Sequence, residues 1–302
     1  MSDKETFKQE LDARTAEIEQ LIGTYLPEET GHQKTIFEAM NYSMKAGGKR
    51  LRPMLMQEMC RLFTGTLLEA VIPFMAAVEM IHTSSLVHDD LPCMDDDMMR
   101  RGKASTWAEY GEDIGVLTGD ALMMYAFETA ANAFETSIDP DELSRIGRAM
   151  GILARKTGVY GMIGGQTVDV ELAGGPIPGD KLEFIYRLKT GALIEASMLI
   201  GAVLGGAAEE DCKIVESLAA KIGMAFQIQD DILDVTGSQD VTGKPSGSDE
   251  KNKKTYVTLE GLDKAKKDVE QISTEAIEEL NKLPGNNDFL EQLIRALVGR
   301  QK

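Results

Sequence analysis

Two aspartate clusters, each placed directly after an apolar stretch with helical spacing, constrain this chain more than any other feature. They read HDDLPCMDD at residues 88–96 and QDDILD at residues 229–234. Burying a carboxylate within apolar helices lowers the free energy of unfolding by several kcal/mol unless positive charge neutralises it. Hard oxygen ligands of this kind suit Mg²⁺, which keeps several waters and is completed by substrate phosphates. The clusters therefore predict helices that face each other across a divalent-cation site, and they indicate metal-bound phosphate chemistry.

Helical periodicity recurs along nearly the whole chain, and no segment shows sustained strand-type alternation. Apolar residues follow three- and four-residue spacing in segments 10–22, 34–44, 141–158 and 265–283. Glycine and proline mark breaks at 47–48, 65, 111, 139–140, 174–176 and 205–206. The 302 residues, 43% of them hydrophobic, contain no repeat or linker and can bury one large core. We therefore expect an all-α fold with residues 1–302 in a single domain.

Cysteine usage and hydropathy bear on the compartment. The three cysteines, Cys60, Cys93 and Cys212, are widely spaced and fit neither a disulfide framework nor a zinc site. The charged N-terminal segment lacks the apolar core of a signal peptide. The most apolar stretch, 196–208, is too short and too rich in glycine to span a bilayer. These features predict a cytoplasmic protein without a membrane span.

The charge balance limits the choice of partners. The formal net charge is −18, and nucleic acid backbones require basic surfaces. Nucleic acid is therefore not an expected partner. A phosphate ligand remains compatible with this charge, because cations bound by the acidic clusters would make the site locally attractive.

Spacing within the second cluster places several polar groups together. Asp230 and Asp234 are one helical turn apart, and Gln227 precedes Asp230 by three residues, so all three share a face. An acidic run is usually a solvated helix face, but the apolar neighbours of both clusters argue against that interpretation. We expect this face to point into a common cavity.

The first cluster is less regular. Asp96 follows Asp89 by two helical turns, but Pro92 would distort a helix between them. Spacing therefore leaves open whether Asp95 or Asp96 points inward. His82 precedes Asp89 by two turns and should face the same cavity at a different depth.

Basic residues surround the acidic clusters in the sequence. Two glycines, 47–48, lead into a predicted helix that begins with Lys49 and Arg52, and a helix N-terminus of this kind favours anions. A long segment, 237–255, is predicted to be a lid beside the second cluster. The other basic residues near the clusters are Arg100, Arg101, Lys103, Lys189, Lys244, Lys253 and Lys254. Together they predict two anion sites, one bridged by metal and one served directly by Lys and Arg.

Five motifs, in this order and spacing, resemble the short-chain trans-prenyl diphosphate synthases, which include farnesyl and geranylgeranyl diphosphate synthases of bacterial and plant type. The resemblance extends from about residue 36 to residue 259. The motifs are GGKRLRP (47–53), HDDLPCMDDDMMRRGK (88–103), GMIGGQTVDVE (161–171), KTGALIEAS (189–197) and FQIQDDILDVTG (226–237). The chain departs from the pattern at 104–107, where Ala-Ser-Thr-Trp replaces the common Pro-Thr-x-His, and this leaves the local loop geometry open.

The resemblance implies an all-helical isoprenoid-synthase bundle around a deep central cavity, a homodimer, and three Mg²⁺ ions per active site. Asp89, Asp90, Asp95 and Asp230 would bind Mg²⁺, supported by Asp231 and Asp234. The allylic diphosphate would contact Arg100, Lys189, Lys244 and Lys253. Isopentenyl diphosphate would contact Lys49, Arg52, His82 and Arg101. Thr190 and Gln227 would flank the reacting carbons.

The same resemblance implies the reaction. Cleavage of an allylic C–O bond leaves a carbocation and a pyrophosphate, so catalysis is stabilisation of the leaving group by metals and lysines. The double bond of isopentenyl diphosphate then attacks, and the departing pyrophosphate removes a proton. An apolar cavity keeps water away from the cation.

In this family the residue five positions before the first aspartate limits product length, and here it is Ser84, followed by Ser85. A serine in place of an aromatic residue leaves room for a twenty-carbon product, geranylgeranyl diphosphate. The insertion that contains Cys93 also resembles geranylgeranyl synthases. Substituting Tyr at Ser84 is then expected to shorten the product. A fifteen-carbon product, farnesyl diphosphate, stays open as the alternative. Three side chains on a neighbouring helix could close the end of the cavity in place of an aromatic residue, namely Met123, Met124 and Phe127.

Other protein classes explain less of the sequence. A class I terpene cyclase would share an aspartate-rich helix but would not need GGKRLRP with His82 for a second diphosphate. A non-catalytic subunit of a heteromeric synthase would typically lack one aspartate cluster. An acidic helical interaction protein would explain the charge but not carboxylates within apolar helices.

Overall fold

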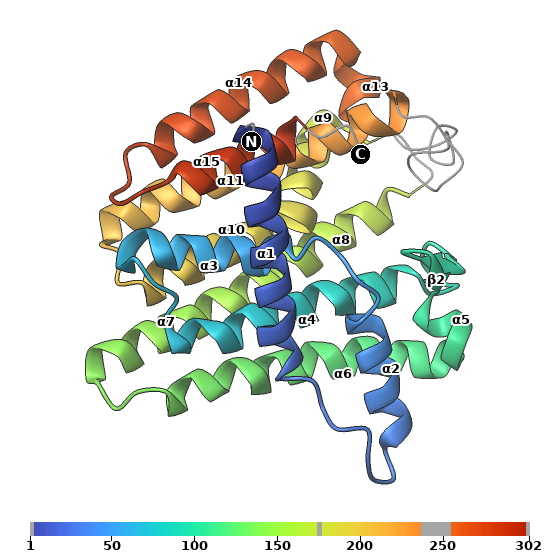
Figure 1. The fold of residues 1–302 in the computed structure, drawn as a ribbon. Helices are drawn as coiled ribbons and strands as arrows, with labels where there is room; N and C mark the ends of the chain where they lie inside the picture. The colour runs from blue at the N-terminus through green and yellow to red at the C-terminus, as the bar shows by residue number, and fades with distance from the viewer. Residues whose placement is uncertain (1–2, 174–176, 237–254, 300–302) are drawn as a thin grey trace.

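Long α-helices form most of the chain, as their periodicity predicts. The computed structural model describes residues 3–173, 177–236 and 255–299 (Figure 1). The first elements are α1 (Asp3–Gly23), α2 (Lys34–Met44), α3 (Leu51–Thr64), η1 (Glu69–Val71) and α4 (Ile72–Asp89). They are followed by β1 (Met99–Arg100), β2 (Lys103–Ala104), α5 (Thr106–Tyr110), α6 (Glu112–Ala131), η2 (Asn132–Glu135) and α7 (Pro140–Thr157).

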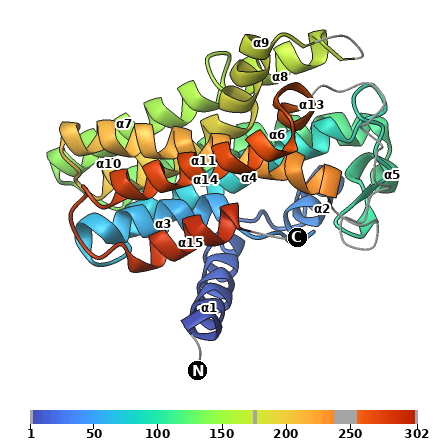
Figure 2. The same ribbon diagram turned by 90° about the horizontal axis from the view of Figure 1, so that it is seen from above.

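The remaining described elements complete the bundle. They are α8 (Met162–Glu171), α9 (Gly179–Ile185), η3 (Tyr186–Gly191), α10 (Ala192–Leu204), α11 (Glu209–Thr236), α13 (Tyr256–Glu260), α14 (Leu262–Leu280) and α15 (Asp288–Val298). Most long helices run roughly side by side, whereas α1 crosses them, and its N-terminal end projects from the bundle (Figures 1 and 2).

Helix α10 lies at the centre of the core. All of its residues are buried, and it packs against α3, α7 and α11. Beyond these layers α4 packs against α6, and α11 packs against α14. A helix surrounded on all sides explains why residues 196–204, which form most of the apolar 196–208 stretch, are so hydrophobic.

Local sequence signals set several helix ends. The Asp139 side chain accepts hydrogen bonds from the backbone N–H groups of Asp141 (3.0 Å) and Glu142 (2.9 Å), and Pro140 occupies the first helical position of α7. This combination satisfies donors that would otherwise lack partners at a helix start. Helix α3 ends at Gly65, whose φ of +75° is the left-handed conformation favoured at helix C-termini.

The structure departs from the purely helical expectation after α4. Helix α4 ends at Asp89, three residues before Pro92, so Asp95 and Asp96 lie in a turn rather than on the same helix. Strands β1 and β2 then form a two-residue antiparallel hairpin. Helical periodicity could not predict an element this short.

One stretch is long and apolar enough to cross a membrane by composition alone, namely Glu69–Asp89, which forms η1 and α4. In the bundle 72% of its most apolar window is buried by neighbouring helices. Packing in the core therefore accounts for its hydrophobicity.

The close approach of α3 and α10 generates a stability prediction. A Cβ atom at Gly201 would lie 2.2 Å from the Met56 carbonyl oxygen and 3.0 Å from the Met59 Cβ. We expect Gly201→Ala to lower the free energy of unfolding by about 1–3 kcal/mol, because the two helices must move apart. The measurement is urea-induced unfolding followed by circular dichroism.

Gly147→Ala is the matched control, since Gly147 is also inside a helix but a Cβ atom added to it would have no neighbouring atom within 4 Å. That variant should gain up to about 1 kcal/mol from helix propensity. Equal midpoints for Gly201→Ala and wild type would contradict the packing described here.

Candidate active site

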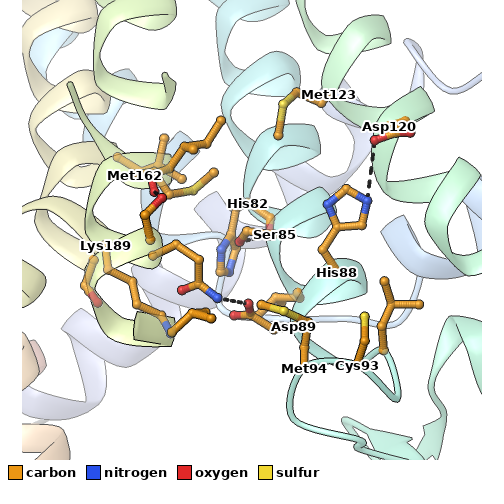
Figure 3. Close-up of a pocket in the computed structure, with 18 of the residues that line it drawn as sticks. His82, Ser85, His88, Asp89, Cys93, Met94, Asp120, Met123, Met162 and Lys189 are labelled. Atoms are coloured by element: carbon orange, nitrogen blue, oxygen red, sulfur yellow. Dashed lines mark hydrogen bonds and ion pairs between the residues drawn. The ribbon is translucent and has the colours of Figure 1, made fainter. Parts of the chain in front are cut away.

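A cavity of about 720 Å³ lies between α4, α6 and α8 and reaches η3 (Figure 3). Its polar lining includes Asp89, Gln166, Lys189 and Thr190. Much of the remaining lining is apolar, and includes Leu86, Met123, Met162, Ile163, Val170 and Leu193. The cavity thus combines charged groups with a largely apolar wall, which suits a ligand with an anionic head and a hydrocarbon tail.

Asp89 is the aspartate of the first cluster that lines the cavity directly. It is partly buried at the end of α4, and the Gln166 side-chain amide donates a hydrogen bond to it at 2.6 Å. Burial raises the pKa of Asp89, while the nearby Lys189 ammonium opposes this rise. A desolvated carboxylate of this kind would be stabilised by a bound cation.

Asp95 lies beside Asp89 after the Pro92 turn. Its backbone N–H donates to the Asp89 carbonyl oxygen at 2.9 Å. Its carboxylate is exposed, and its charge contributes to raising the pKa values of both Asp89 and Lys189. Of the two alternatives left open by spacing, this proximity favours Asp95 over Asp96 as the residue that acts with Asp89.

Asp90, next to Asp89, is paired with an arginine. Its side chain is only 3% exposed, and the Arg100 guanidinium donates to both of its carboxylate oxygens, at 3.0 and 3.2 Å from Nε. A buried carboxylate needs such a partner. Asp90 and Arg100 are therefore engaged with each other and do not line the 720 Å³ cavity, and the metal and diphosphate roles expected for them stay predictions.

In the second cluster, α11 presents its aspartates in different directions. Asp230 is partly buried and Asp234 is exposed, one turn further on. Asp231 is buried, accepts from the Tyr186 hydroxyl, and accepts from the Tyr256 backbone N–H at 2.8 Å. Burial raises the pKa of Asp231 to about 6. In this geometry the Asp231 carboxylate joins η3, α11 and α13, and the metal role expected for Asp231 stays a prediction.

Lys189 and Thr190 lie in η3, which is a π-helical turn, a form often found at functional sites. The Lys189 ammonium donates to Asp169 at 2.7 Å, and the Thr190 hydroxyl donates to Gln227 at 2.7 Å. Desolvation favours neutral Lys189, but Asp89 and Asp169 outweigh it and raise its pKa. The lysine is therefore held charged at the cavity wall.

Two residues that contact this wall, Gln166 within it and Asp169 behind Lys189, were not assigned a role from the sequence. Both belong to the GMIGGQTVDVE motif on α8, three residues apart and hence on one helical face. That spacing within a recognised motif was the available signal. Gln166 contacts Asp89 and Asp169 contacts Lys189, so α8 fixes one group from each side of the cavity.

A second cavity of about 440 Å³ adjoins the first and is mainly cationic. Lys49, Arg52, His82 and Arg101 line it, which brings together the four residues predicted for a directly bound diphosphate. Arg52 and His82 also line the first cavity and therefore lie where the two meet. The buried Nε of Arg52 makes no hydrogen bond within the described part of the chain.

The electrostatics of this cavity keep His82 uncharged. Desolvation, followed by repulsion from Arg52, Arg101 and two further arginines, holds the pKa of His82 well below its ordinary value of 6.5. Burial also lowers the pKa of Arg52, although the attraction of Glu79 opposes this. An anionic ligand would relieve the repulsion among these groups.

The two chain-length candidates face different directions. Ser85 lines the first cavity, whereas Ser84 is fully buried and donates to the Gly119 carbonyl oxygen of α6 at 2.8 Å. Met123 lines the cavity, but Met124 is 69% exposed on the other side of α6. Ser85 and Met123 therefore line this cavity, whereas Ser84 and Met124 do not, and the effect of Ser84 on product length stays a prediction.

The carboxylates present can be compared with the needs of Mg²⁺. No three Asp, Glu, His or Cys side chains of residues 3–173, 177–236 and 255–299 converge closely enough to hold a metal by themselves. Mg²⁺ commonly takes one or two carboxylates and completes its shell with water and phosphate, and the desolvated Asp89 beside Asp95 fits that pattern. Lys244, Lys253 and Lys254, predicted for a lid, lie outside the described residues.

Comparison with known proteins gives a consistent set of relatives. The family model described as polyprenyl synthetase matches residues 33–295. The chain is 48% identical over 248 residues to a geranylgeranyl pyrophosphate synthase of Catharanthus roseus, a match that covers 81% of this chain and 68%, about two thirds, of that protein. It is 41% identical over 265 residues to a geranylgeranyl diphosphate synthase of Cyanophora paradoxa, covering 87% of this chain and 86% of that one.

A solved structure supports the fold. The geranyltransferase of Helicobacter pylori, complexed with magnesium and isoprenyl diphosphate, matches with a TM-score of 0.81 and 29% identity. The match covers 99% of this chain and 97% of that chain. The arrangement of helices described above is therefore similar to that of an enzyme crystallised with magnesium and isoprenyl diphosphate.

The neutral imidazole in the cationic cavity generates a pH prediction. Unfolded protein binds a proton at His82 near pH 6.5, whereas the folded metal-free protein does not, so stability falls as the pH drops below 6.5. His82→Gln should remove this contribution, at most about 1.4 kcal/mol per pH unit. The measurement is urea unfolding of wild type and variant between about pH 7.5 and 5.

Proton NMR of the three histidines provides the direct check. One imidazole, absent in His82→Gln, should not titrate in this range, and inorganic pyrophosphate should restore its titration. Three ordinary titration curves in the free protein would contradict the assignment.

Proposed function

Because the chain belongs to the polyprenyl synthetase family and is a prenyltransferase, we propose that it joins isopentenyl diphosphate head to tail (1′–4) to allylic diphosphates, with geranylgeranyl diphosphate as the product. The observation that carries this proposal is the pair of adjoining cavities that share Arg52 and His82. The 720 Å³ cavity has carboxylates and a largely apolar wall, and the 440 Å³ cavity has arginines and a lysine. A reaction between two diphosphates requires both.

The residues have distinct roles in the first cavity. Asp89 and Asp95 would hold Mg²⁺ together with Asp230 and Asp234 from α11, and we propose three ions, which when bound neutralise the diphosphate leaving group. Lys189 presents a positive charge to the same oxygens, while Asp169 fixes its position. The apolar wall excludes water from the allylic carbocation.

The second cavity serves the other substrate. Lys49, Arg52 and Arg101 would bind the diphosphate of isopentenyl diphosphate, and neutral His82 would donate one hydrogen bond to it. Thr190 and Gln227, which are hydrogen-bonded to each other, would position the reacting carbons. A cyclase has no second diphosphate and would leave this cavity without a role.

Several features support a twenty-carbon product. The two relatives described above are geranylgeranyl synthases by name, and the cavity is lined by the small residue Ser85 where an aromatic side chain would shorten it. Farnesyl diphosphate is the alternative, because Met123 of α6 also reaches the wall and could stop the chain at fifteen carbons.

We further propose a homodimer. Helix α6 leaves Val116, Leu117 and Met124 exposed at 39%, 54% and 69%. Apolar side chains grouped on one helix favour association with another surface. The cytoplasmic location predicted from the sequence stays a prediction, and the Catharanthus relative is chloroplastic.

Product analysis tests the reaction directly. Purified protein with isopentenyl diphosphate and dimethylallyl, geranyl or farnesyl diphosphate should yield geranylgeranyl diphosphate from each primer when Mg²⁺ is present, and nothing with chelator. Elongation that stops at fifteen carbons would keep the reaction but overturn the product. Cyclic hydrocarbon, or no turnover of any primer, would overturn the reaction.

A substitution at Ser85 tests the assignment of the cavity wall. Ser85→Phe should shift the main product from twenty to fifteen carbons, because the ring would fill volume that the last isoprene unit requires. The control is Ser84→Ala, which removes the hydrogen bond to the Gly119 carbonyl but leaves the cavity unchanged. Its product distribution should match wild type, with stability lower by about 1 kcal/mol. An unchanged product from Ser85→Phe would show that another residue forms the limiting wall.

A further inference from the structure

Arg50 borders the cationic cavity between Lys49 and Leu51, yet its guanidinium turns into the protein. Its guanidinium is 2% exposed and reaches three elements. It donates to Glu19 of α1 at 2.8 Å, to Glu79 of α4 at 2.8 Å, and to the Met44 carbonyl oxygen at the end of α2 at 2.7 Å. None of these contacts takes part in the reaction steps described above.

The backbone conformation at Arg50 depends on these side-chain contacts. Its φ is +48°, in the left-handed region, which costs a non-glycine residue free energy and persists only where surrounding contacts enforce it. Two positions before it, Gly48 has a φ of +141°. The inward side chain of Arg50 therefore holds a loop that would not adopt this shape unaided, and this loop carries Lys49 and leads to Arg52.

The same loop also holds Arg101, which follows strand β1 in the hairpin. The Arg101 guanidinium donates to the Gly47 carbonyl oxygen, and a Cβ atom at Gly48 would lie 2.8 Å from it. The position of the loop thus sets the positions of Lys49, Arg52 and Arg101 in the cavity.

Glu79 has a particular place in this arrangement. It is 2% exposed and is the one acidic residue among the described residues that line the cavity. Besides pairing with Arg50, it attracts Arg52 and Arg101 electrostatically. A single carboxylate therefore offsets repulsion among three guanidinium groups when no anion is bound.

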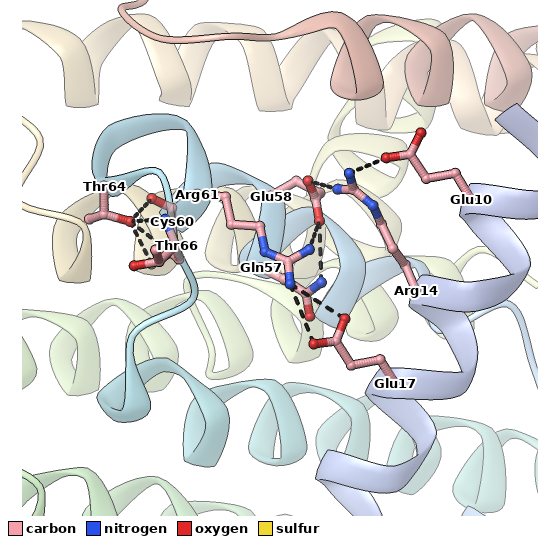
Figure 4. Close-up of polar contacts among 9 residues, drawn as sticks. All are labelled: Glu10, Arg14, Glu17, Gln57, Glu58, Cys60, Arg61, Thr64 and Thr66. Atoms are coloured by element: carbon pink, nitrogen blue, oxygen red, sulfur yellow. Dashed lines mark hydrogen bonds and ion pairs between the residues drawn. The ribbon is translucent and has the colours of Figure 1, made fainter. Parts of the chain in front are cut away.

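Helix α1 extends the arrangement to the surface. Arg14 of α1 pairs with Glu58 of α3, and Glu17 of α1 pairs with Arg61 of α3 (Figure 4). These two pairs join α1 to the body of α3, away from the loop, whereas Glu19, two residues beyond Glu17, reaches Arg50 itself. The loop is thus fixed from α1 on one side and from α4 on the other.

We propose that Arg50, together with Glu79 and Glu19, is a positioning residue for the cationic diphosphate site, and that the buried ion pairs hold Lys49, Arg52 and Arg101 in their binding geometry before substrate arrives. This inference rests on the proposed function for the identity of the substrate, isopentenyl diphosphate. Arg50 itself does not touch the diphosphate. Its effect is exerted through its neighbours.

Steady-state kinetics of Arg50→Gln and Glu79→Gln provide the test. Each variant should raise KM for isopentenyl diphosphate about tenfold or more, while KM for the allylic diphosphate stays within about twofold of wild type. The double variant should be no worse than the more affected single variant, because the two residues act as one unit. Equal effects on both KM values, or strictly additive effects, would overturn the proposal.

Helix α1 offers a matched pair of milder variants. Glu19 and Glu17 have side chains 44% and 46% exposed, and both accept from an arginine of the α3 region. Glu19→Gln should raise KM for isopentenyl diphosphate about threefold, whereas Glu17→Gln should leave it unchanged. Their similar exposure makes the two substitutions comparable in their effect on folding, and melting temperatures check this. Identical kinetics for the two variants would overturn the role of Glu19.

A binding measurement separates this inference from the proposed reaction. Isothermal titration of inorganic pyrophosphate in chelator should show weaker binding to Arg50→Gln and Glu79→Gln than to wild type and Glu17→Gln, whether or not any variant makes product. If wild type shows no metal-dependent condensation, the proposed function fails. If pyrophosphate binds all four proteins equally, the positioning role fails.

Discussion

Buried charge is the constraint on which the rest of this structure depends. A carboxylate or guanidinium at the end of an apolar helix is tolerated only where an opposite charge or a hydrogen-bond donor meets it. The fold meets this need in several ways: Asp90 with Arg100, Asp231 with Tyr186, and Arg50 with Glu79. Asp89 is only partly compensated, by the amide of Gln166 and the charge of Lys189. The fully paired residues Asp90, Asp231 and Arg50 therefore hold helices together, whereas the partly compensated Asp89 lies in the candidate site.

Much of the fold could be predicted from the sequence, since long amphipathic helices and glycine or proline breaks are local signals. Asp139 and Pro140 at the start of α7 and Gly65 at the end of α3 are examples. The hairpin formed by β1 and β2 could not be predicted, because two residues in each strand have no detectable period. Motif resemblance and spacing predicted that Asp89, His82, Lys189 and Arg52 belong to the site, and the structure places all four at the first cavity.

The orientation of neighbouring residues was harder to predict. Adjacent aspartates look alike in a sequence, yet Asp89 lines the cavity while Asp90 is buried against Arg100. Ser84 and Ser85 differ in the same way, because successive helical residues point about 100° apart and the helix end fixes their rotation. Gln166 and Asp169 were missed because their three-residue spacing within the GMIGGQTVDVE motif does not show which partners their side chains contact. Such details depend on contacts with residues far away in the chain.

The π-helical turn η3 has a consequence for how this enzyme could be altered. A π-turn contains one residue more than an α-helix would place in the same length, so deleting a residue there would regularise the hydrogen bonding. It would also rotate everything on one side of the deletion by about 100° relative to the other side. Lys189 would lose Asp169, or Tyr186 would lose Asp231, because the two pairs anchor opposite ends of the turn. The π-helical turn thus sets a register in which Lys189 can reach Asp169 while Tyr186 reaches Asp231. A regular α-helix would not place both side chains toward their partners.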